Sequence, residues 1–167
     1  MDGLYAESRA KKKVTMKDNL IKFLIVGVIL ACFVIGIIGI KVILFILGLI
    51  LLVAAYYLMP ALSTEYEYVF CDGQVDFDRI NGGSYRKTVL RVDFERLVVI
   101  APKNSHALDG YRHNGVVVKD FSSMEEDAKI YGMVVTSEEK LTLIYFEPNE
   151  KMLAAMKQKA PRKIMDC

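Results

Sequence analysis

One long apolar run constrains the fold of this chain more than any other feature. Between Phe23 and Met59 the sequence holds 37 residues and a single charge, on Lys41. A transmembrane helix needs about 20 apolar residues, so the run is too long for one ordinary span and matches two short ones. One continuous helix would extend for roughly 55 Å at about 1.5 Å per residue, nearly twice the hydrocarbon thickness of a bilayer. We therefore expect a helical hairpin.

The expected hairpin has spans over 20–38 and 42–59, which follow a basic N-terminal arm over 1–19. Its corner is expected at Gly36, Gly39 and Lys41, because glycine adopts turn conformations and lysine is costly in the hydrocarbon. A cleaved signal peptide is the alternative, since basic residues precede the apolar run. That run is far longer than the apolar region of a signal peptide and contains no cleavage signature, so we favour two membrane helices.

Charge asymmetry predicts the orientation of this hairpin. Six basic residues lie between Arg9 and Lys22, against Lys41 alone at the corner. The positive-inside rule then places the N-terminus in the cytoplasm. Two spans return the chain to the same side, so we expect a multi-pass protein of the plasma membrane with both termini cytoplasmic. The three cysteines have no framework spacing, which suits a reducing compartment.

The composition of the spans bears on packing and transport. Gly27, Ala31 and Gly48 are small enough to let the two helices approach closely. Neither span contains Asp, Glu, His or Arg, so the sequence offers no obvious residues for an ion or proton pathway.

The part that follows, over 60–167, is long enough for one domain with its own core. Its local patterns are mostly those of short strands, expected at 65–70, 74–80, 85–92, 97–101, 116–121, 129–136 and 141–146. The last segment changes to helical spacing, and Asn149 can cap a helix over 150–159. Seven strands followed by one helix is the order of a pleckstrin-homology-like (PH-like) domain, and the order and count would also fit other small barrels. In that fold a bent antiparallel sheet or barrel is closed at one end by the C-terminal helix.

The first two of these strands flank Asp72-Gly73, a strong signal for a hairpin with a two-residue turn. The register of such a hairpin opposes Tyr68 to Phe77 and Phe70 to Val75, which predicts one core face.

The other face of the hairpin opposes two carboxylates, on Glu67 and Asp78. We expect the third strand to place Lys87 across from Asp78 and to leave Arg86 in solvent. Carboxylates on neighbouring strands point in parallel, whereas a metal ion needs oxygens that converge. We therefore favour a charge-compensated sheet surface over a cation site.

Two histidines, His106 and His113, lie in a long segment over 102–115 with Asp109 between them. A zinc site would need tighter spacing and more ligands, so we expect the histidines to face solvent. No catalytic residue, cofactor ligand or metal ligand is assigned. The segment is still a candidate binding surface, because long loops within compact domains are uncommon without a use.

Six residues are candidate contacts for lipid or a protein partner: Lys11, Lys12, Lys13, Arg86, His106 and His113. The lysine run fits contact with anionic lipid headgroups and fits a topology signal equally well. The sequence after Met59 has two more acidic than basic residues, unlike a nucleic-acid-binding surface.

Three segments carry a resemblance to known families: "EYEYVFCDGQVDFDRI", "YRKTVLRVDFERLVVIAP" and "YFEPNEKMLAAMKQKAPRKI". Together they resemble an uncharacterised family of small bacterial membrane proteins, known only as a domain of unknown function. The middle segment is also similar to bacterial pleckstrin-homology domains, whose basic turns often hold phosphoinositide headgroups. The resemblance implies a two-helix membrane anchor with a cytoplasmic β domain, and it supplies no catalytic residues.

These observations predict a non-enzymatic binding or scaffolding module, anchored in the membrane and facing the cytoplasm, with an unknown protein partner. Two alternatives stay open. One is a membrane-tethered enzyme with its site in the 102–115 loop, and the other is an accessory subunit of a membrane complex.

Overall fold

The computed structural model describes residues 4–14, 16–39, 42–61, 64–83, 85–113, 115–137 and 140–165. The chain divides into two compact units. The helical unit contains Val14–Thr64 and Asn81–Tyr85, and the β unit contains Met1–Lys13, Glu65–Ile80 and Arg86–Cys167. The helices are therefore inserted into the chain of the β unit after its first segment.

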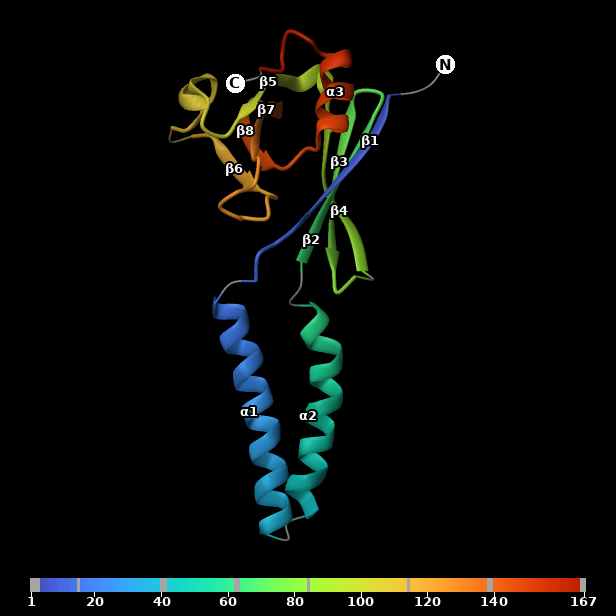
Figure 1. Ribbon diagram of the computed structural model, residues 1–167, viewed down its shortest axis with the longest axis vertical. Helices are drawn as coiled ribbons and strands as arrows, with labels where there is room; N and C mark the ends of the chain where they lie inside the picture. Colours follow the sequence, from blue (N-terminus) through green and yellow to red (C-terminus); the bar gives the residue numbers. More distant parts are fainter. Residues whose placement is uncertain are drawn as a thin grey trace. The chain divides into compact units, whose positions relative to one another are not determined.

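The helical unit consists mainly of α1 (Met16–Ile38) and α2 (Val42–Ala61), which lie side by side (Figure 1). Within the described residues, one helical segment, Asp18–Ile38, is long and apolar enough to cross a bilayer, with a mean hydropathy of 2.9. The apolar part of α2, Val42–Tyr57, is shorter. Both helices begin and end close to the expected bounds.

Glycines mark the contact between the two helices, but not all of those expected. A Cβ added at Gly48 would lie 3.4 Å from the Cys32 side chain, and one added at Gly36 would lie 3.0 Å from the Phe45 backbone nitrogen. Gly36 thus lies inside α1 at the contact, not at a corner. Gly27 has nothing within 4 Å, so its expected role in the approach of the helices is wrong. Lys41 lies outside the described residues.

Among the described residues, eight strands form two four-stranded sheets, and a short 3-10 helix connects one sheet to the other (Figure 1). The first sheet has the order β1-β2-β3-β4, from β1 (Tyr5–Lys11), β2 (Thr64–Cys71), β3 (Gln74–Asn81) and β4 (Tyr85–Asp93). The second has the order β5-β7-β8-β6, from β5 (Leu97–Pro102), β6 (Val117–Asp120), β7 (Tyr131–Ser137) and β8 (Lys140–Phe146). The 3-10 helices η1 (Phe94–Arg96) and η2 (His106–Tyr111) follow β4 and β5, and α3 (Glu150–Lys159) follows β8.

Strand β1 corrects the expectation of a separate basic arm over 1–19. It pairs antiparallel with β2 from Tyr5↔Cys71 to Lys11↔Glu65. Its alternate residues, Ala6, Ser8 and Ala10, are buried. Alanine and serine differ less in hydrophobicity from their polar neighbours than larger apolar residues would, so the period-two pattern of a half-buried strand is weak in this segment.

A second correction concerns strand direction. Strand β6 pairs parallel to β8, from Val117↔Thr142 to Asp120↔Tyr145, whereas an antiparallel arrangement was expected. A parallel pair requires a crossover connection. Residues 121–130 and β7 provide it, and β7 comes to lie between β5 and β8.

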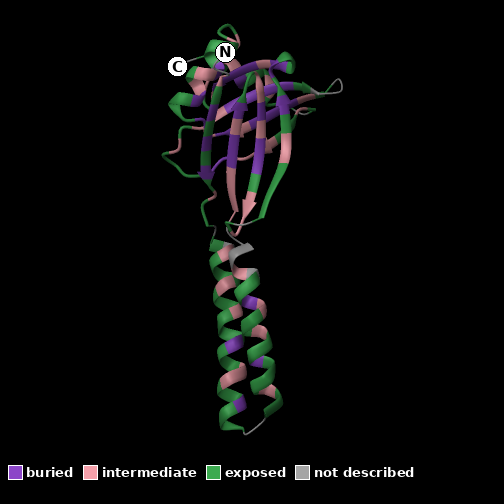
Figure 2. Cartoon of the chain, turned by 90° about the vertical axis from the view of Figure 1, so that its right-hand side faces the viewer, coloured by how far each residue is buried: buried purple, intermediate pink, exposed green. Residues whose placement is uncertain are grey.

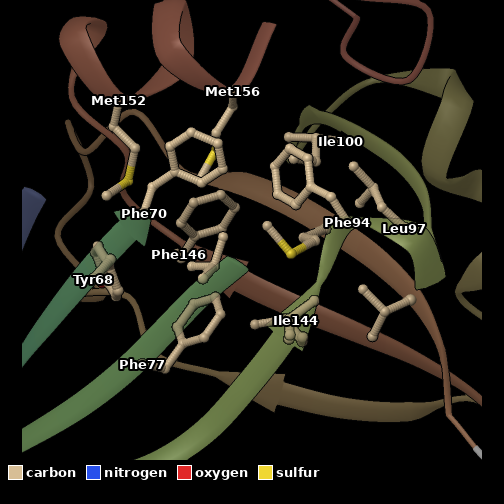
Figure 3. Close-up of a cluster of buried hydrophobic side chains, with 14 of the residues drawn as sticks. Tyr68, Phe70, Phe77, Phe94, Leu97, Ile100, Ile144, Phe146, Met152 and Met156 are labelled. Carbon is tan, nitrogen blue, oxygen red and sulfur yellow. The ribbon is translucent and has the colours of Figure 1, made fainter. Parts of the chain in front are cut away.

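Aromatic side chains from both sheets form the core of the β unit, and α3 closes it. In the first sheet, residues of β1 alternate between buried and exposed, and most other buried residues lie on β2 and β3 (Figure 2). Met152 and Met156 of α3 are fully buried and point toward the rings of Phe70 and Phe146 (Figure 3). Burial of each such side chain stabilises the fold by about 1.5–3 kcal/mol. Mainly-β sheets with a C-terminal helix fit the expected PH-like fold.

The N-terminus of α3 is fixed to β1. The Asn149 side chain accepts a hydrogen bond from the Met152 amide at 2.8 Å, as expected for its capping role, and donates one to the Glu7 carbonyl at 2.8 Å. The Ser8 hydroxyl donates to the Glu147 carbonyl at 2.9 Å. The helix that closes the core therefore depends on a strand that precedes α1.

Candidate functional site

The β2–β3 hairpin has the turn that the sequence predicts. Asp72 and Gly73 have φ values of 47° and 99°, the left-handed values of the two central residues of a type I′ turn. Tyr68, Phe70, Val75 and Phe77 are all buried, so the predicted core face is confirmed. The Asp72 carboxylate accepts a hydrogen bond from the Leu4 amide at 3.0 Å, which ties the turn to the segment before β1.

The opposite face of this hairpin carries a charge network centred on two buried carboxylates. Glu67 is 1% exposed and Asp78 is 6% exposed. Arg9 from β1 contacts Glu67 Oε1 through Nη2 at 2.6 Å, and Arg86 from β4 contacts Glu67 Oε2 through its own Nη2. Arg86 Nε also donates to Asp78 Oδ2 at 2.6 Å. One guanidinium thus bridges carboxylates from two strands.

The expected partner of Asp78 was therefore wrong, because Arg86 occupies the place predicted for Lys87, which is exposed. Arg91 makes a similar pair with Asp76 at 2.7 Å. The two arginines are an odd number of residues apart, and the two aspartates an even number. In a regular strand the two arginines would point to opposite faces, so their contacts depart from the register that the sequence predicts.

Electrostatics follow the contacts of this network. The hydrogen bond to Asp78 raises the pKa of Arg86 above its ordinary value, and the nearby charge of Glu67 acts in the same direction. Arg86 therefore stays charged and compensates both carboxylates. No group of three or more metal-ligating side chains is found in the described part of the chain, and here the cation between the carboxylates is a guanidinium.

The 102–115 segment is more ordered in its local structure than a plain loop. Ser105 caps η2 by accepting a hydrogen bond from the Ala107 amide, and Leu108 is fully buried. His106 Nδ1 lies 3.0 Å from Asp109 Oδ2, but the His106 side chain is fully exposed. His113 is also exposed, and four cavities found among the described residues are lined by none of His106, Asp109 and His113.

The predicted contact lysines have different surroundings. Lys11, at the end of β1, lies 3.7 Å from Glu65. The Lys13 amide donates to the Ser123 carbonyl at 2.8 Å, and the Lys13 side chain is exposed. Contact of Lys11, Lys12 and Lys13 with lipid stays a prediction, as does contact of His106 and His113 with a partner.

Sequence reasoning missed a cavity of the β unit that has a volume of about 920 Å³. Its walls are the β2–β3 turn, η1 and the segment after α3. These segments are far apart in the sequence, and no sequence motif predicts that they lie together in the fold. The density of basic residues from Lys157 to Lys163 was the only available signal.

Comparison with known proteins identifies the fold family. A family model described as a bacterial PH-like domain (DUF6106) matches residues 2–166. The chain belongs to this family. No curated protein and no solved structure matches it.

The family DUF6106 has no known function, which agrees with the resemblance found in the sequence. The matched range begins before β1 and contains both helices. Membership confirms the PH-like fold and assigns no ligand.

Proposed function

We propose that this chain is a membrane-anchored binding or scaffolding module, in which α1 and α2 cross the bilayer as a hairpin and the PH-like domain faces the cytoplasm. PH-like domains commonly serve as binding modules, and this analogy of fold supports the binding role only in general terms. The ligand must be argued from the surface of this chain.

The pairing of β1 with β2 is the observation that carries the membrane part of the proposal. One strand ends at Lys11, before α1, and the other begins at Thr64, after α2, yet their residues pair from end to end. Both ends of the helical segment must therefore be on the same side of any membrane that it enters. If α1 crosses, α2 has to return.

Composition supports the same arrangement. In α1, an apolar segment of 21 residues suffices for a span. The shorter apolar part of α2 would cross with local thinning of the bilayer or with its flanking residues at the interface. The basic residues near β1 and the start of α1 favour a cytoplasmic position for both termini.

Reporter fusions test this topology. Two reporters are fused in turn to each terminus of the full chain. Alkaline phosphatase is active only on the outer side of the plasma membrane, and green fluorescent protein fluoresces in the cytoplasm. We expect fluorescence and no phosphatase activity from both ends. Phosphatase activity at the C-terminus would refute the two-span hairpin.

The binding role is tested by mild-detergent pull-down of the full chain, followed by reconstitution with each recovered protein. A stable binary complex would support a scaffold or a subunit of a membrane complex. Anionic lipids are a second ligand class, for which Lys12 and Lys13 are the better candidates, because the charge of Arg86 is already used by Glu67 and Asp78. The enzyme alternative gains no support from the exposed His106 and His113.

A further inference from the structure

The cavity of about 920 Å³ beside the β2–β3 turn has walls of opposite charge. The turn and η1 form one continuous wall, since the Phe94 amide donates to the Gly73 carbonyl at 2.8 Å. This wall contributes three carboxylates, from Asp72, Asp93 and Glu95. The segment after α3 forms the other wall and contributes three cations, from Lys159, Arg162 and Lys163.

These charges do not neutralise one another. Among the described residues, no ion pair within 4.0 Å joins a cation of this cavity to a carboxylate. The Lys163 ammonium instead donates to the neutral carbonyl of Phe94 at 3.3 Å. The Lys163 side chain thus attaches the basic wall to the backbone of the acidic wall, and among the described residues no ion pair across the cavity neutralises its charges.

The position of Lys159 is also fixed by packing. A Cβ added at Gly73 would lie 2.8 Å from Lys159 Cε, so the lysine stem lies where a side chain at the turn would otherwise be. Gly73 has a φ of 99°, which favours glycine independently. The same residue therefore makes the turn and makes room for one cation of the cavity.

Size and charge together select a class of ligand. A volume of about 920 Å³ is at the upper end of small-molecule pockets, which span about 300–1,000 Å³, and far exceeds the need of a single ion. Three carboxylates in the lining disfavour a polyanion such as a phosphoinositide headgroup. Phe94, Ala160 and Pro161 add apolar surface between the charges.

We infer that this cavity binds an extended peptide segment of a protein partner whose residues alternate in charge. The inference rests on the proposed role as a binding module and names the ligand class. In an extended chain, successive side chains point in opposite directions, with a period of two. A lysine at one position then faces the acidic wall while a glutamate at the next faces the basic wall.

The test compares two fluorescein-labelled peptides of equal composition: one alternates lysine and glutamate, and the other has them in two blocks. Each is titrated with the full chain in nanodiscs of zwitterionic lipid, and binding is measured by fluorescence anisotropy. We expect the alternating peptide to bind about tenfold more tightly, because several partly exposed pairs each contribute modestly. Equal binding of the two peptides, or binding of neither, would overturn the inference.

Variants assign the binding to the cavity. Lys159→Glu combined with Arg162→Glu makes both walls mostly acidic and should weaken the alternating peptide about tenfold. Both side chains are exposed, so folding should be preserved. Lys87→Glu combined with Lys151→Glu makes the same change of net charge outside the cavity and should have little effect. Equal losses in the two double variants would refute the assigned site.

A third probe separates ligand classes. Inositol hexakisphosphate, a soluble polyanion, should not compete with the alternating peptide at this site. Competition that the Lys159/Arg162 double variant abolishes would show a polyanion site and overturn the peptide assignment. Such a result would leave the membrane-anchored module itself intact, since the reporter fusions and the pull-down test it separately.

Discussion

Replacement of Arg86 by glutamine is the sharpest test of the charge network on the first sheet. The change removes the cation that bridges Glu67 and Asp78 and keeps a side chain of similar length. Glu67 keeps its contact with Arg9, but among the described residues Asp78 has no other cation. A nearly buried carboxylate would then be left without charge compensation, at a cost in desolvation that nothing replaces.

The magnitude follows from burial. Removal of one partner from a buried ion pair typically costs about 3–5 kcal/mol. Arg86 itself is half exposed, with a side-chain exposure of 51%, so solvent screens part of the interaction. We expect Arg86→Gln to lower the free energy of unfolding by about 2–3 kcal/mol, and Lys87→Gln to change it by less than about 0.5 kcal/mol.

The assay is urea denaturation of the full chain in detergent micelles. The protein has no tryptophan and nine tyrosines, so near-ultraviolet circular dichroism of tyrosine reports tertiary structure. Asp78→Asn in the Arg86→Gln background should cost much less than Asp78→Asn alone, because the pair is already broken. Equal effects of Arg86→Gln and Lys87→Gln, or a larger effect at Lys87, would refute the network as described.

Three further changes test other parts of the structure. Burial raises the pKa of Tyr68 above its ordinary value of about 10. The neutral Tyr68 side chain therefore stabilises the fold fully below that pH, and this stabilisation is lost as the pH rises through the folded-state pKa. Tyr68→Phe should reduce this alkaline loss of stability, measured by urea denaturation at several pH values. Asn149→Ala removes the N-cap of α3 and should cost about 1 kcal/mol in the same assay, whereas no loss would contradict the capping contact. Gly48→Cys should form a disulfide with Cys32 on oxidation, because an added Cβ lies 3.4 Å from the Cys32 Cβ, while Leu49→Cys should not; mass spectrometry after alkylation distinguishes them.

Local signals predicted most of the fold. The Asp72-Gly73 turn, the seven strands after α2 and the Asn149 cap each depend on neighbouring residues, and the structure confirms them. Strand β1 was missed because its buried residues are small. The parallel direction of β6 depends on how distant strands are ordered in a sheet, which hydrophobic alternation does not encode.

The candidate sites were predicted less well than the fold, for a physical reason. A regular register placed Lys87 beside Asp78, but in the structure the neighbouring residue, Arg86, makes this contact. The cavity beside Gly73 requires three distant segments to meet, so it exists only in the folded domain. The sequence shows that Lys159, Arg162 and Lys163 lie close together, but it does not show that carboxylates from distant segments face them.

The position of β1 before the helices has a consequence for synthesis. During translation β1 is synthesised first, then α1 and α2, and only afterwards β2, the strand with which β1 pairs. The first sheet therefore cannot be completed until the helical segment has left the ribosome. Closing a flexible loop of this length would carry an entropic cost, but contact between α1 and α2 shortens the distance that remains. In the proposed topology, a chain whose second helix fails to insert would leave β1 without its partner, exposing Ala6 and Ala10 and the unpaired edge of β2 to proteases and chaperones.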